Sequence, residues 1–260
     1  MATFDLNNFV IDRIIRGVAL SQKDDSVLFS INQIQNASLN CASESTDAVD
    51  ALGTPIATFY RAKTAEFSAE NALFDMNLMA TQLGTAKKVA SAASKVTVPA
   101  MESFTVPEGS KYVLKHVPLA APTEIYAVNG DSTFGVKYTK NTSATAEAFA
   151  YTESDHSIAL PTGLAVGTEM FVMYEYETEN AVEVVNSANN FPVGCKFVME
   201  VLGCNVCDQT NLVYAYVIFN NFKLSPDFDW SIATDGAHPF SGKAQQDYCD
   251  KEKRLGVMAA

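Results

Sequence analysis

The sequence has little charge and no long hydrophobic run. Only 18% of its 260 residues are charged, against about 25% in an average soluble domain. No stretch approaches the roughly 18 consecutive apolar residues that a membrane-spanning helix needs, so we expect no transmembrane segment. The hydrophobic fraction, 48%, is ordinary and provides enough apolar surface to offset the entropy cost of folding. We therefore expect one large or two small folded domains.

Positive charge is scarce as well. Eighteen Lys and Arg stand against 30 Asp and Glu, so the net charge is 18 − 30 = −12 at pH 7. Proteins that bind duplex DNA or anionic membranes through a basic face need clustered Lys and Arg. The charge balance argues against both of these functions.

Cysteine is present in an odd number, five. An odd count is typical of a reducing compartment rather than of a secreted disulfide framework. Because Asp12 and Arg13 interrupt the apolar residues of the N-terminus, it has no signal-peptide pattern, and we expect synthesis in a cytoplasm. Cys204 and Cys207 form a lone CxxC, for which only Cys195 is a candidate third zinc ligand. We favour ordinary cysteines in a hairpin loop over a metal or redox site.

No group of residues suited to catalysis is apparent. The three histidines, His116, His156 and His238, are far apart, and no nucleophile accompanies any of them locally. The known nucleophile, zinc-protease and phosphate-loop motifs are missing. Aspartates near the C-terminus are more typical of solvated turns than of a cation site; they are Asp227, Asp229 and Asp235. We predict no enzymatic activity and no cofactor.

Apolar residues alternate with polar ones over much of the first 70 positions, which predicts strands. Strands are expected at Ala37–Ala42 and Ile56–Arg61, on either side of a polar, turn-rich loop at Ser43–Pro55. The apolar period then changes to three and four residues. This change predicts one amphipathic helix, from an N-cap at Ser68 to Gly84.

The region 99–180 consists of short alternating runs between Pro and Gly turns. About seven short strands at this spacing predict a small Ig-like β-sandwich. The expected strands are Ser103–Val106, Tyr112–His116, Glu124–Val128, Thr133–Tyr138, Ala146–Tyr151, Ser157–Leu160 and Glu169–Glu175. We therefore predict a discontinuous β domain, residues 1–98 and 181–260, with a second β domain inserted at 99–180.

Longer strands return after residue 180. Cys195–Leu202 and Leu212–Leu224 are expected to pair through a hairpin loop at Cys204–Gln209. The second strand is apolar on both faces, which is typical of a strand that is covered twice. Together with abundant aromatics, little surface charge and no chemical site, this pattern favours a protein whose surface is largely covered by copies of itself.

Segments 26–84 and 181–245 resemble the tail tube (major tail) proteins of bacteriophages. The similar parts are a strand entry, DALGTPIATF, at Asp50–Phe59, and a turn, AEFSAEN, at Ala65–Asn71 that precedes a single amphipathic helix. The C-terminal stretch SPDFDWSIATDGAHPFSG is also similar to the arm that follows the sheet in such proteins. The insert at 99–180 is a departure from a minimal tube protein.

The resemblance implies a mainly β protein, a tail-tube-type β-sandwich or barrel with one flanking helix. It implies a virion structural protein, made in the bacterial host's cytoplasm, whose copies form stacked and typically hexameric rings. Genomic DNA would pass through the lumen without specific binding. Sheath, terminator or baseplate proteins would be further partners. The alternative is a capsid decoration or head–tail accessory protein that attaches through its β-sandwich.

Three segments are candidates for self-association on this interpretation. The loop Ser43–Pro55 is expected to reach the adjacent ring and to become ordered as it docks. Apolar residues of an N-terminal and a C-terminal arm are expected to anchor in neighbours or, as an equal alternative, to pack over the protomer's own core. The candidate residues are Glu44, Asp47, Ala48, Asp50, Leu52 and Thr54 in the loop, Phe9, Ile11 and Ile14 in the first arm, and Phe228, Trp230 and Phe240 in the second.

Overall fold

A computed structural model describes residues 8–247 and 251–259 of the chain, and Cys249 lies outside the described residues. The chain forms two compact units. The first is built from the described residues of Met1–Lys87 and Val184–Ala260, and the second from Lys88–Glu183. The expectation of a mainly β protein with one α-helix is confirmed for the described residues. Within them, no helix is long and apolar enough to span a membrane.

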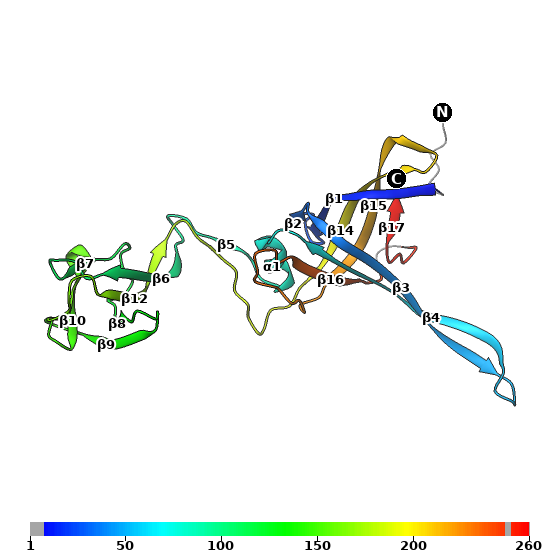
Figure 1. Cartoon of the computed structure of the whole chain (residues 1–260). Coiled ribbons are helices and arrows are strands. Elements are labelled where there is room, and N and C mark those ends of the chain that lie inside the picture. The colour runs from blue at the N-terminus through cyan, green and yellow to red at the C-terminus, as the bar shows by residue number, and fades with distance from the viewer. Residues whose placement is uncertain (1–7, 248–250, 260) are drawn as a thin grey trace. The chain divides into compact units, whose positions relative to one another are not determined.

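The first unit is one curled sheet of eight antiparallel strands (Figure 1). The strand order is β2-β1-β14-β15-β16-β4-β3, and β17 pairs with β15. The strands are β1 (Phe9–Ser21), β2 (Val27–Ile31), β3 (Ile34–Val49), β4 (Pro55–Asn71), β14 (Gly194–Asn205), β15 (Asp208–Leu224), β16 (His238–Ala244) and β17 (Val257–Ala259). The hairpin expected between β14 and β15 is confirmed, with only Val206 and Cys207 between the two strands.

Phenylalanine fills the core of the first unit. Phe67, on β4, is 2% exposed, and its ring centroid lies 5.7 to 6.3 Å from those of four other phenylalanines. These four are Phe197, Phe219, Phe222 and Phe240. Strands that are far apart in the sequence therefore share one aromatic core, which contributes both buried apolar area and ring–ring contacts.

The helix begins later than the spacing of apolar residues predicts. Ser68 is not an N-cap, because residues 65–71 complete β4 and pair with β16. The helix α1 (Met76–Gln82) begins after Asp75, whose carboxylate accepts hydrogen bonds from the backbone N–H groups of Asn77 and Leu78 at 2.9 and 2.7 Å. The expected C-terminal glycine is confirmed: Gly84 has φ +65°, and a Cβ there would lie 2.2 Å from the carbonyl oxygen of Phe191.

A buried histidine connects this helix to β16. His238 is fully buried, and both of its ring nitrogens have partners. Nδ1 accepts a 3.4 Å hydrogen bond from the backbone N–H of Asp75, and Nε2 lies 2.9 Å from Oε1 of Gln82. These contacts fit the neutral ring, with Nε2–H as donor. Burial lowers the pKa of His238, while the charge of Asp75 opposes this shift.

We expect the stability of the first unit to fall on mild acidification. A histidine pKa that is lower in the folded than in the unfolded state stabilises the fold fully above the unfolded pKa of about 6.5. This contribution decreases as the pH falls from that value toward the folded pKa. Urea unfolding of the wild-type protein should therefore show a smaller free energy of unfolding at pH 5.5 than at pH 7.5. His238→Gln should reduce this difference, and an unchanged difference in the variant would contradict the assignment.

The second unit is a seven-stranded sheet with the order β6-β12-β8-β9-β10-β11-β7. Its strands are β6 (Val96–Thr105), β7 (Lys111–Val113), β8 (Glu124–Val128), β9 (Phe134–Asn141), β10 (Ala148–Thr152), β11 (Ser157–Ala159) and β12 (Glu169–Thr178). All seven expected strands are present. A separate two-stranded ladder joins β5 (Lys88–Val89) to β13 (Val182–Glu183). The strands β9 and β10 are parallel, and the Ig-like identity of this unit stays a prediction.

A buried carboxylate organises the interior of the second unit. Glu102, on β6, is 3% exposed. It accepts hydrogen bonds from the hydroxyl of Tyr112 at 2.8 Å, from the backbone N–H of Lys115 at 3.1 Å and from the hydroxyl of Tyr174. Burial, and then the bond to Glu102, raise the pKa of Tyr112 to about 12. The same two causes raise the pKa of Tyr174, so both phenols remain donors at neutral pH.

Truncation of this carboxylate should destabilise the second unit. Glu102→Ala leaves three donors without their acceptor, the hydroxyl of buried Tyr174 and the part-buried donors of Tyr112 and Lys115, which we expect to cost about 2 to 4 kcal/mol. Glu177→Ala, at an exposed position of β12, is the matched control and should change the free energy of unfolding by less than about 0.5 kcal/mol. Denaturant unfolding of both variants measures the difference. Equal effects would show that the Glu102 hydrogen bonds contribute no net stability.

Candidate self-association surfaces

The most exposed structure in the first unit is the distal part of the β3–β4 hairpin. We call residues 44–61 the hairpin arm. Figure 1 shows the arm extending well beyond the other strands of the first unit. The two strands of the arm pair antiparallel from Glu44↔Arg61 to Val49↔Pro55, and every arm residue except Ala48, which is half-buried, is exposed. Among the described residues, no third strand pairs with this part of the hairpin.

The tip of the arm is a closed, hydrogen-bonded turn. The carboxylate of Asp50 accepts hydrogen bonds from the backbone N–H groups of Leu52 and Thr54, each at 2.8 Å. These bonds lower the pKa of Asp50, so its charge is retained at neutral pH. Gly53 has φ +85°, a conformation that favours glycine. The expectation of a loop over Ser43–Pro55 is therefore wrong: β3 continues to Val49, and only 50–54 form a turn.

The arm combines apolar side chains with negative charge. Exposed fractions are 92% for Leu52, 69% for Ile56 and 71% for Tyr60. Phe59, 54% exposed, lies on the opposite face from Ile56 and Tyr60, because side chains alternate along a strand. Residues 44–61 contain three acidic side chains and one basic residue, Arg61, which lies opposite Glu44 at the start of the arm. Both faces of the arm thus expose large apolar groups beside carboxylates.

The structure brings six of the predicted contact residues together in this arm. Glu44, Asp47 and Ala48 lie on β3, and the other three, Asp50, Leu52 and Thr54, lie in the tip. Asp47 also accepts a 2.7 Å hydrogen bond from the hydroxyl of Thr58 on β4. Ile56, Phe59 and Tyr60 are not among the contact candidates that the sequence predicts, because their alternation indicates only a strand.

The predicted N-terminal arm is a strand of the sheet. β1 pairs with β14 from Phe9↔Asn205 to Ser21↔Cys195. Phe9 and Ile14 pack against the core of the first unit, which corresponds to the alternative of a contact within the protomer. Ile11 is 52% exposed and has apolar surface available to a neighbour.

The predicted C-terminal anchors also have partners within the first unit. Phe240 is 2% exposed in the phenylalanine core, and its strand, β16, is internal to the sheet. It therefore offers no surface to a neighbour. Trp230 stacks on Phe74, with centroids 4.3 Å apart. Phe228 lies 5.9 Å from the ring of His238. Trp230 and Phe228 are half-buried.

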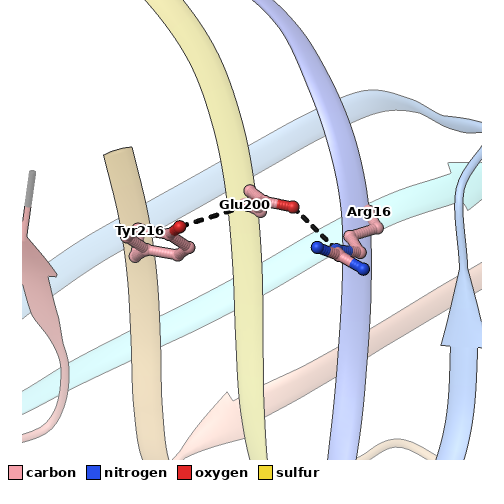
Figure 2. A network of polar contacts seen from close by, with 3 residues as sticks. All are labelled: Arg16, Glu200 and Tyr216. Atoms are coloured by element: carbon pink, nitrogen blue, oxygen red, sulfur yellow. Dashed lines mark hydrogen bonds and ion pairs between the residues drawn. The ribbon is translucent and has the colours of Figure 1, made fainter. Parts of the chain in front are cut away.

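A second exposed surface lies on the outer face of β1, β14 and β15. Figure 2 shows its central row, in which Glu200 on β14 lies between Arg16 on β1 and Tyr216 on β15. Arg16 Nε donates to Glu200 Oε2 at 2.7 Å, and the Tyr216 hydroxyl donates to Oε1 at 3.2 Å. Beside this row, Leu212 and Tyr214 are each 51% exposed. The sequence already shows that β15 is apolar on both faces, and this pattern could have predicted an apolar surface here.

The cysteines show no shared site among the described residues. Cys195 is fully buried and its thiol donates to the carbonyl of Phe222 at 3.3 Å. Burial raises the pKa of Cys195 to about 12. Cys204 is half-buried, whereas Cys207 and Cys41 are exposed. No group of three or more His, Cys, Asp or Glu side chains that could hold a metal ion occurs in the described part of the chain.

Comparison with known proteins identifies one family. The model of the YomU/Tube protein family matches residues 9–258, a span that includes residues of both units. No curated protein matches the chain significantly.

Proposed function

Because this chain belongs to the YomU/Tube protein family, a family of phage tail tube proteins, we propose that its copies form rings that stack into a tail tube. The family indicates a structural component of the virion rather than an enzyme. We further propose that six copies of this chain form each ring, and that the tube is part of a phage tail made in a bacterial host. It rests on the surfaces described above.

The hairpin arm is the observation that carries the proposal. An isolated two-stranded hairpin is marginally stable in water, and a long, apolar strand edge is prone to pair with another chain. The described part of the chain provides neither a third strand nor a cover for the distal arm. The arm nevertheless has a closed tip and large apolar groups on both faces. A neighbouring copy would provide the missing cover.

Contacts between two different surfaces of identical subunits produce either closed rings or open filaments. The hairpin arm and the outer face of β1, β14 and β15 are two such unlike surfaces in the first unit. A ring needs lateral contacts between copies, for which the free edges of β2 and β3 at the ends of the sheet are available. Stacking of rings needs an axial contact, for which the arm is available.

The negative charge is consistent with a conduit for DNA. With a net charge of −12, the protomer repels phosphates, so a lumen with an acidic lining would let the genome slide without binding. Sheath, terminator or baseplate proteins are the further partners that this proposal includes.

Negative-stain electron microscopy of the purified full chain tests the proposal. We expect rings or hollow tubes whose length increases with protein concentration. Discrete monomers or trimers at every concentration would contradict it. Saturable binding of such particles to preformed capsids would instead support a decoration protein.

A further inference from the structure

A groove of about 1060 Å³ lies at the base of the hairpin arm. Its walls come from the middle of β3 and β4, from β15 and β16, and from Lys253 and residues 255–258. Its floor reaches the core, because Phe219 and Ala65 line it and are 2% and 6% exposed. Leu39 and Met258, which are 47% and 53% exposed, add apolar side chains at its surface.

The charge of this groove is opposite to that of the protein as a whole. Three lysines line it, Lys63, Lys243 and Lys253, and none of the described lining residues is acidic. Nζ of Lys243 lies 2.7 Å from Oε1 of Glu66, so one of the three charges has a carboxylate partner in the protomer. In a chain with a net charge of −12, such a groove is a distinctive place for an acidic, apolar segment to bind.

The hairpin arm has the complementary chemistry. Its residues 44–61 contain three carboxylates and one basic group, Arg61, which lies opposite Glu44 at the end of the arm away from the tip. Leu52 in the tip and Ile56 at the start of β4 are exposed. The carboxylate of Asp50 is held ionised by two backbone N–H groups. The protomer cannot place its own tip in its own groove. The paired strands hold the tip about 25 Å away, at roughly 3.3 Å per residue from Cys41 to Val49.

We propose that the tip of the hairpin arm of one copy docks in the groove of a second copy. This inference rests on the proposed function, since it names the site that receives the axial contact. Apolar side chains at the tip cover the apolar floor, and the carboxylates of the arm lie near Lys63 and Lys253. Because the groove lies at the base of the arm and the tip lies at its far end, the second copy can present its own tip to a third. The contact therefore extends without closing.

Cross-linking can test this contact in the full chain. The variant combines Leu52→Cys with Cys204→Ser, Cys207→Ser and Cys249→Ser. Two accessible thiols then remain, the new one at the tip and that of Cys41, which lines the groove. Cys195 also remains, but it is buried. A short bis-maleimide cannot join the two thiols within one protomer. We expect a ladder of covalent multimers, with position 52 joined to Cys41 in the linked peptides. Adding Cys41→Ser should remove the ladder.

A charge-reversal experiment uses the same cross-link as its readout. Lys63→Glu with Lys253→Glu should reduce the ladder at least tenfold. Lys115→Glu with Lys140→Glu, an equal change of charge at exposed positions of the second unit, should not reduce it. Adding Glu44→Lys and Asp47→Lys to the groove variant should restore the ladder. Asp50 is left unchanged because it forms the turn.

The outcomes separate this inference from the proposed function. If rings or tubes form in electron micrographs but position 52 links to residues outside the groove, or to none, the groove assignment is wrong and the tube function stands. If neither tubes nor linked multimers form at any concentration, both are wrong. A ladder that persists after Cys41→Ser also overturns the groove assignment.

Discussion

Leu52→Lys combined with Ile56→Lys should abolish tube formation while leaving the protomer folded. Burial of a Leu or Ile side chain contributes about 1.5 to 3 kcal/mol. Loss of both from a contact should therefore weaken each association by about 10²- to 10⁴-fold. Both side chains are exposed in the protomer, at 92% and 69%, so the free energy of unfolding should change by less than about 0.5 kcal/mol. Sedimentation and electron microscopy measure assembly, and urea unfolding measures the fold.

A matched control distinguishes an effect of where the lysines are placed from an effect of the added charge itself. Val113→Lys with Val136→Lys adds the same charge at valines of the second unit that are 57% and 61% exposed. This variant should assemble like the wild type. Tubes of normal length from the arm variant would contradict the role of the arm, and equal loss of assembly in both variants would point to a general effect of charge.

Phe67→Ala should produce the largest loss of stability among single substitutions in the first unit. Phe67 is 2% exposed and contacts four other phenylalanine rings. Truncation of a buried Phe to Ala costs about 3 to 5 kcal/mol, because transfer free energy is lost and a cavity remains. For a unit of this size, the midpoint of thermal unfolding should fall by roughly 6 to 20 °C.

Phe59→Ala is the control on the same strand. Phe59 and Phe67 both lie on β4, but Phe59 is 54% exposed in the hairpin arm. Its truncation should change the free energy of unfolding by less than about 1 kcal/mol and should act on assembly instead. Calorimetry of both variants measures the change in stability that each truncation causes. A similar loss of stability from both would mean that the arm is part of the cooperative core.

The local sequence pattern predicted strands well where polar and apolar residues alternate. The hairpin turn between β14 and β15 follows from Cys204–Gln209, and the strands of the second unit follow from their Pro and Gly turns. The helix shows the limit of this reasoning. Residues 65–71 fit both a strand and the first turn of a helix, and only pairing with β16 decides for the strand.

The candidate contact surfaces were predictable in part. The polar composition of Ser43–Pro55 predicts a loop, and only the resemblance to tail tube proteins implies that it makes a contact. The alternation of Ile56, Phe59 and Tyr60 predicts an ordinary half-buried strand. Alternation reveals the pleat of a strand and does not reveal whether anything covers either face. For the same reason Phe240 and Leu52 look alike in the sequence, although one is 2% and the other 92% exposed.

By itself, the sequence determined that this protein is a β-rich chain with one helix, few basic residues and no apparent catalytic motif. These properties depend on composition and on short-range periodicity, which act within a few residues. Only the tertiary structure decided where the helix begins, which aromatics form the core, and that Lys63 and Lys253 line one groove. These two lysines are 253 − 63 = 190 positions apart, and only the long-range strand pairing of the curled sheet brings such distant segments together.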